Sequence, residues 1–265
     1  EGAVQDYEAD QAFESGQLVG ALRGFLEEAD RLYYTFGRSS ELDQALTQAQ
    51  EELRLQSRRG VQPVESLLDP RAILHEMRLI KSPAELEIMR QAADISREAH
   101  QEAASLLKPG QMEYEIEARL DYVFRRRGGW GAAYGSIVAG GSRATVLHYV
   151  RNDQEFEDGD LVLIDAGAEL RGYASDVTRT YPVNGRFEGA ARDVYEVVLA
   201  AQKVAILNAR PGSNLADLHS ATLRRLVEGM VDLGLLEGDT DSLIESEAFR
   251  RYYMHGTSHW LGLDV

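Results

Sequence analysis

The segment Leu161–Thr180, LVLIDAGAELRGYASDVTRT, constrains the fold of this chain more than any other stretch. Four apolar residues precede Asp165, and a second extended run, from Tyr173 to Tyr181, contains Asp176. Branched and aromatic residues bounded by glycines predict two strands joined by a tight turn. A turn centred just after Leu170 would place Asp165 directly opposite Asp176, on the same face of the hairpin.

Two carboxylates that face each other across a hairpin repel one another. A bound cation between them would remove this repulsion, and oxygen ligands on a rigid hairpin suit hard divalent metals. The hairpin therefore predicts a metal site. The alternative is one aspartate that flanks a turn and one that faces solvent, in a chain rich in acidic residues.

Composition limits the classes of function. The chain has 265 residues, which is enough for one large domain or two ordinary ones. A net charge of −16 argues against nucleic acid or an anionic membrane as the main partner. The chain has no cysteine, so a metal must be held by Asp, Glu and His. No apolar run approaches the roughly 20 residues of a membrane span. With no signal peptide visible, we expect a cytoplasmic location.

Three parts are predicted along the chain: residues 1–70 as part of an amino-terminal α/β accessory domain, 71–81 as a linker, and 82–265 as the main domain. The main domain begins with a capping box, Ser82-Pro83-Ala84-Glu85, which predicts a helix to about Leu107. A second helix is expected from about Glu113 to Arg127, after Lys108-Pro109-Gly110.

A similar helix pair occurs later in the chain. Helical patterns cover Ala190–Ala209 and Leu215–Leu233, separated by Arg210-Pro211-Gly212. Each pair is followed by strand-like sequence. The repeat indicates an internal duplication, with two α/β halves around a shared sheet.

Three of the six histidines are candidate site residues. His148 lies in a predicted strand, Val146–Val150, where a neutral imidazole could hydrogen-bond a substrate. His255 and His259 have the spacing of an HExxH motif, but Gly256 replaces the glutamate and Gly-Thr-Ser is poor helix sequence. A loop or strand is therefore expected there. The alternative for each is a packed or surface histidine.

Three motifs together, IDAGAELRGYASDVTRTYPVNG, LHYVRND and MHGTSHWLGLDV, closely resemble those of bacterial Xaa-Pro aminopeptidases (aminopeptidase P). These enzymes belong to the pita-bread metallopeptidases, with prolidase, methionine aminopeptidase and the metal-free creatinase. The resemblance runs from about Ile80 to Val265 and implies an α+β pita-bread fold for the main domain, with two pseudo-duplicated halves that each combine a helix pair with antiparallel sheet. The first 70 residues resemble the family's amino-terminal domain more weakly.

The resemblance implies roles for individual residues. Asp165 would bind one metal, Asp176 would bridge two, and His259 would be the imidazole ligand of the other. His148 and His255 match histidines that contact substrate and steady the tetrahedral intermediate, and Tyr134 falls near a tyrosine of the same pocket.

The resemblance also implies two Mn(II) ions with a bridging water or hydroxide, with Co or Zn as alternatives. The expected reaction removes the N-terminal residue from peptides whose second residue is proline. A homo-oligomer, dimer or tetramer, is expected. Prolidase, a dipeptidase for Xaa-Pro, is the nearest alternative, and a non-catalytic pita-bread binding module is the other.

One departure from the family pattern affects these expectations. The family's metal site needs two more glutamates, which lie beyond the HGxSHxLGxDV motif, whereas this sequence stops at Val265 within it. The sequence also does not begin with methionine. It is therefore expected to be an internal piece of a longer enzyme, inactive by itself.

Overall fold

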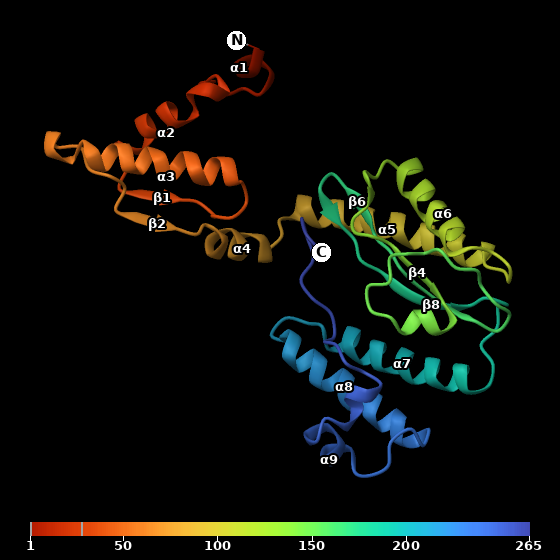
Figure 1. The fold of residues 1–265 in the computed structure, drawn as a ribbon. Helices are drawn as coiled ribbons and strands as arrows, with labels where there is room; N and C mark the ends of the chain where they lie inside the picture. The colour runs from red at the N-terminus through yellow and green to blue at the C-terminus, as the bar shows by residue number, and fades with distance from the viewer. Residues whose placement is uncertain (1, 28) are drawn as a thin grey trace. The chain divides into compact units, whose positions relative to one another are not determined.

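The computed structural model describes residues 2–27 and 29–265 and divides into two compact units, residues 1–80 and 81–265 (Figure 1). The division falls within the segment 71–81, where a linker was expected, and most of that segment is helical. The reading of residues 1–70 as part of an accessory domain stays a prediction. Within the described residues, no helix is long and apolar enough to cross a membrane.

The first unit packs helices on a small parallel sheet. Strand β1 (Arg31–Tyr33) pairs in parallel with β2 (Ser66–Leu68). The core of this unit is formed by residues such as Leu46 and Leu53 on one face of α3 (Ser40–Leu55). Helix α3 begins where the Ser39 side chain accepts a hydrogen bond from Leu42 N. The elements are α1 (Gly2–Asp6), η1 (Ser15–Gln17), α2 (Leu18–Leu26), β1 (Arg31–Tyr33), α3 (Ser40–Leu55), η2 (Ser57–Arg59), β2 (Ser66–Leu68) and α4 (Arg71–Leu79).

The second unit begins with the two predicted helices, α5 (Pro83–Leu106) and α6 (Glu113–Arg126). The capping box is confirmed, since Ser82 N donates to Glu85 Oε2 at 2.6 Å and Glu85 N donates to Ser82 Oγ at 3.3 Å. The face of α5 that carries Ala92, Ala99 and Ala103 is fully buried.

Two three-stranded antiparallel sheets pack against these helices. The first has the order β3 (Gly131–Ala132), β6 (Ala168–Leu170), β7 (Tyr173–Ala174), and the second the order β4 (Ile137–Gly140), β5 (Leu161–Asp165), β8 (Thr178–Pro182). Along β5 the side chains of Val162 and Ile164 enter the core. Because side chains alternate along a strand, Asp165 lies on the opposite face.

The second predicted helix pair is also present, as α7 (Gly189–Asn208) and α8 (Leu215–Asp232). These helices share a separate core with Phe249. In the described part of the chain, residues 233–265 form α9 (Thr240–Glu245), η4 (Ala248–Arg251) and loops, without the strands expected after the second pair. The duplicated pattern is therefore seen in the two helix pairs. The strands of the second unit, β3 to β8, all follow the first pair.

Candidate metal centre

The turn of the central hairpin lies one residue later than the sequence predicted. Leu170 pairs with Tyr173, so Arg171 and Gly172 form the two-residue loop. Their φ angles are +52° and +84°, as a type I′ turn requires at both central positions. A turn one residue earlier would force Leu170 into the left-handed region, which glycine tolerates far better.

This register separates the two aspartates by one diagonal step. Asp165 pairs with Thr178, and the bonds Ala166 N→Val177 O (3.1 Å) and Ser175 N→Ala168 O (3.0 Å) bring Asp176 opposite Gly167. The prediction that Asp165 and Asp176 are direct partners was wrong. Both still lie on the same face, because diagonal neighbours across a hairpin share a face.

The hydroxyl of Tyr134 joins the two aspartates. It lies 2.7 Å from Asp165 Oδ1 and 3.0 Å from Asp176 Oδ1. Burial and the hydrogen bonds to two carboxylates raise the pKa of Tyr134 far above its ordinary value, so it remains a donor. Burial also raises the pKa of Asp165, and the charge of Asp176 acts in the same direction.

His259 completes this group of side chains. The last residues of the chain return to the hairpin, where Ala174 N donates to Gly262 O at 2.8 Å. His259 Nε2 then lies 3.0 Å from Asp176 Oδ2. Its Nδ1 is 2.9 Å from the Trp260 carbonyl, which only accepts, so Nδ1 carries a hydrogen. With Nδ1 carrying the hydrogen, Nε2 of a neutral imidazole has a lone pair beside the Asp176 carboxylate, so both are available as ligand atoms for a cation.

The chemistry of these donors fits a divalent metal. Two carboxylates and one imidazole nitrogen are ligands for Mn, Zn and related ions. In residues 2–27 and 29–265, however, no three His, Asp or Glu side chains are arranged as a closed metal-binding group. Asp165, Asp176 and His259 therefore offer suitable ligand atoms without forming a complete site by themselves. The Tyr134 hydroxyl bonds both carboxylates.

His148 does not lie on a strand, in contrast to the prediction. After β4 the chain forms the 3-10 helix η3 (Gly141–Thr145), and His148 follows in an exposed loop with φ at +55°. The neighbouring Val146 and Leu147 are also exposed, so the apolar residues that suggested a strand do not form a buried face. Among the described residues, no hydrogen bond or ion pair joins His148 to the two aspartates.

His255 lies in a loop, as expected. Its Nδ1 donates to the Gly256 carbonyl at 2.9 Å, and its exposed ring lies 4.9 Å from that of Tyr253. Tyr253 bonds Thr257, which in turn meets His219 Nδ1 at 3.2 Å. These contacts connect the loop to helix α8. No hydrogen bond or ion pair links His255 to the aspartates in the described part of the chain.

A buried polar cluster holds the hairpin from the side of α5. Ser96 Oγ and Ser175 Oγ are 2.6 Å apart, and Ala168 N donates to Ser96 Oγ at 2.8 Å. His100 is 2% exposed, and its Nε2 lies 3.0 Å from Ala166 O. These bonds reach the residues next to Asp165 and Asp176 from the opposite face. Sequence reasoning assigned no role to His100, because nothing local distinguishes a buried helical histidine from an exposed one.

The fold and these side chains define a class of protein. The model of metallopeptidase family M24 matches residues 87–265, and this chain belongs to that family. The Xaa-Pro aminopeptidase of Escherichia coli is 40% identical over the whole of this chain, and that of Haemophilus influenzae is 51% identical over 75% of it.

Solved structures agree with this assignment. The aminopeptidase PepP of Pseudomonas aeruginosa is 45% identical and covers the whole chain with a TM-score of 0.94. A zinc-substituted aminopeptidase P of E. coli, in complex with product, gives 0.95. The expected pita-bread fold is thereby confirmed. The chain spans about 60% of the length of these two proteins and 46% of the H. influenzae relative.

Proposed function

We propose that the protein containing this chain is a metal-dependent aminopeptidase that removes the N-terminal residue from peptides with proline in the second position. The observation that supports this most is the group of contacts in which Tyr134 joins Asp165 to Asp176, and His259 Nε2 lies 3.0 Å from Asp176 Oδ2. It occurs in a chain 40% identical to the E. coli Xaa-Pro aminopeptidase.

Asp165, Asp176 and His259 are the proposed metal ligands. Two Mn(II) ions are the proposed occupants of the complete site, with Co or Zn as alternatives, and the zinc-substituted E. coli relative supports a divalent ion at such a site. When bound, such ions lower the pKa of water and polarise the scissile carbonyl.

The chain's own groups would orient these components. Tyr134 holds the two carboxylates together, and its second hydrogen bond keeps Asp176 aligned with Asp165. His148 and His255 are proposed to contact the substrate. Because Nδ1 of His255 already donates to Gly256, His255 would donate to a developing oxyanion from Nε2 only as an imidazolium. In its neutral form, Nε2 would accept a hydrogen bond from the substrate.

The proposal is tested by offering the whole-gene product a tripeptide Xaa-Pro-Xaa, a dipeptide Xaa-Pro and a tripeptide Xaa-Ala-Xaa in parallel. We expect metal-dependent release of the first residue from the proline tripeptide and little from the alanine tripeptide. Cleavage of the dipeptide alone would identify a prolidase instead. No cleavage of any peptide after metal loading would contradict the proposal and favour a binding module.

Two further expectations stay predictions under this proposal. A homo-oligomer would be detected by light scattering of the purified whole-gene product. A cytoplasmic location would be checked by cell fractionation.

A further inference from the structure

A fully buried carboxylate lies outside the metal centre. Glu113, the first residue of α6, is 0% exposed. Its Oε1 accepts from Gly140 N at 3.0 Å and from Arg143 Nε at 2.8 Å. Its Oε2 accepts from Tyr149 Oη at 2.8 Å and from Gln154 N at 3.1 Å. Four donors satisfy the acceptor capacity of one carboxylate.

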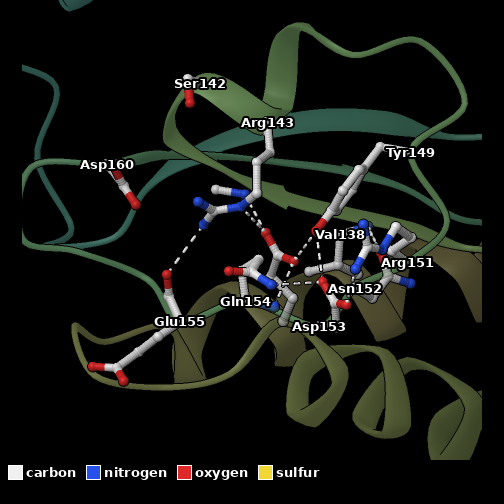
Figure 2. A network of polar contacts seen from close by, with 12 residues as sticks. Val138, Ser142, Arg143, Tyr149, Arg151, Asn152, Asp153, Gln154, Glu155 and Asp160 are labelled. Atoms are coloured by element: carbon white, nitrogen blue, oxygen red, sulfur yellow. Dashed lines mark hydrogen bonds and ion pairs between the residues drawn. The ribbon is translucent and has the colours of Figure 1, made fainter.

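All four donors belong to one segment of the chain. They are spaced from the end of β4 at Gly140 to Gln154, and the segment between them carries His148. Figure 2 shows the side chains of Arg143 and Tyr149 extending toward the same position from different parts of this segment. One side chain on α6 therefore holds the beginning, the middle and the end of the loop that presents His148.

The charges and protons of this network are balanced. Arg143 is 26% exposed and supplies the positive charge that a buried carboxylate needs. Desolvation disfavours the charged form of Arg143. The hydrogen bond to Glu113 and the charge of Glu113 outweigh this effect, so the pKa of Arg143 is raised. Partial burial and the hydrogen bond to Glu113 raise the pKa of Tyr149 to about 12. Tyr149 thus remains a donor at neutral pH.

The loop needs such support, because two of its residues have left-handed backbone. The φ angle is +55° at His148 and +47° at Asn152, in the left-handed region that is uncommon for residues other than glycine and that asparagine and histidine adopt more readily than most. Buried Asn152 is held by its own side chain, whose Oδ1 accepts from Val138 N at 2.9 Å and whose Nδ2 donates to Ser136 O at 2.8 Å. His148 is connected to the network through the next residue, Tyr149.

We propose that Glu113 is a positioning residue that, through Tyr149 and Arg143, fixes the loop so that His148 is presented to the substrate. This inference rests on the proposed function, because it requires that His148 contacts the substrate. Glu113 is fully buried, and none of its hydrogen bonds within the described part of the chain reaches a proposed metal ligand, so it would act only through the loop.

The test compares Glu113→Gln with Glu155→Gln in the metal-loaded, whole-gene product. Glu155 directly follows this segment, and its backbone carbonyl accepts from Arg143 Nη2 at 3.1 Å, but its side chain is exposed and points away from Arg143 (Figure 2). A shift of a reacting group by about 1 Å can lower a rate about 100-fold. We expect Glu113→Gln to reduce kcat on Xaa-Pro-Xaa at least about tenfold, with metal content unchanged. Glu155→Gln should match the wild type.

A double-mutant cycle separates positioning from simple loss of stability. If Glu113 acts through His148, adding Glu113→Gln to His148→Ala should lower kcat no further. Additive losses, or loss of metal together with activity, would overturn the inference. If His148→Ala lowers kcat and Glu113→Gln does not, the inference fails and the proposed function stands. If neither change lowers turnover, the role proposed for His148 fails and the inference fails with it.

A second measurement does not depend on activity. Hydrogen exchange at the Gly140 and Gln154 amides, and the NMR signal of the His148 ring, should change in Glu113→Gln and stay constant in Glu155→Gln. Unchanged exchange and an unchanged ring signal would overturn the inference even if the wild type cleaved no peptide. Should Glu113→Gln fail to fold, the milder Tyr149→Phe removes one donor, and the same shift of the His148 signal is expected.

Discussion

A β-carbon added to Gly167 would lie 1.7 Å from the carbonyl oxygen of Ser175 on the facing strand. No real β-carbon approaches an oxygen so closely, so only glycine fits at this point of the hairpin. Gly167 lies two residues after Asp165, and Ser175 immediately precedes Asp176. The close approach of these two backbones therefore sets the spacing of the proposed ligands.

The first prediction is that Gly167→Ala disrupts the hairpin. Overpacking typically costs about 1–3 kcal/mol and more where backbone cannot move, and the obstacle here is backbone. The variant should unfold at lower urea concentration and bind less metal. Gly20→Ala on α2, where a β-carbon would meet nothing within 4 Å, is the control and should stabilise by about 0.5–1 kcal/mol. Equal stability of the two variants would contradict the close approach.

The second prediction concerns metal content. Asp176 contacts both Tyr134 and His259, so Asp176→Asn removes the charge that links the three groups. Mass spectrometry of the whole-gene product after Mn(II) dialysis should show metal in the wild type and a large loss in the variant. Asp158→Asn, in the exposed turn before β5, is the matched control and should keep its metal. Full metal content in Asp176→Asn would exclude Asp176 as a ligand.

The third prediction is a pH dependence that comes from His100. Burial lowers the pKa of His100 below its ordinary value of 6.5. The unfolded chain then binds a proton more readily than the folded one, so stability is complete above pH 6.5 and falls as the pH drops toward the folded pKa. His100→Gln, which keeps a donor for Ala166 O and does not titrate, should weaken this decline.

Urea unfolding of the metal-free protein at neutral and mildly acidic pH would measure the effect. The same substitution at His75, which is exposed on α4, serves as the control and should leave the decline unchanged. An equal acid sensitivity of the wild type and His100→Gln would show that His100 contributes nothing to it.

The fourth prediction concerns the capping box of α5. The Glu85 carboxylate accepts hydrogen bonds from Ser82 N and from the Tyr173 hydroxyl. These bonds and the interaction with the Ser82 hydroxyl lower the pKa of Glu85. A carboxyl with a lowered folded pKa stabilises the protein above its unfolded pKa of 4.5 and loses this effect as the pH falls through the folded pKa. Glu85→Gln should therefore melt below the wild type at neutral pH and alongside it in acid.

Thermal melts across this pH range would test the difference, with exposed Glu237→Gln as the control. A constant gap between Glu85→Gln and the wild type at every pH would show that the charge of Glu85 is not responsible.

Features that depend on neighbouring residues were predictable from the sequence. The capping box and proline at the start of α5 and the Pro-Gly stops of the helix pairs act through local backbone chemistry, and the structure confirms these helices. The face shared by Asp165 and Asp176 was also correct, because alternation along a strand is a property of the chain itself.

The details that place the site required the tertiary structure. The turn lies one residue later than predicted, which shifts each cross-strand partner by two residues, because Arg171 and Gly172 rather than Leu170 adopt positive φ. His148 lies in a loop and not in the predicted strand, because the neighbouring Val146 and Leu147 are exposed and do not pack into a core. Glu113 resembles any acidic residue in the first turn of a helix, and only the donors that the fold brings from residues 140–154 make it the centre of a network.

The sequence by itself thus determined the helices, the hairpin, the face that its aspartates share and the motifs of the family. Tertiary structure alone decided which backbone atoms approach each other at Gly167, that the histidine of α5 is buried, and which carboxylate accepts the hydrogen bonds of residues 140–154. The physical reason is that secondary structure follows local preferences, whereas burial and hydrogen-bond partners depend on residues distant in the chain.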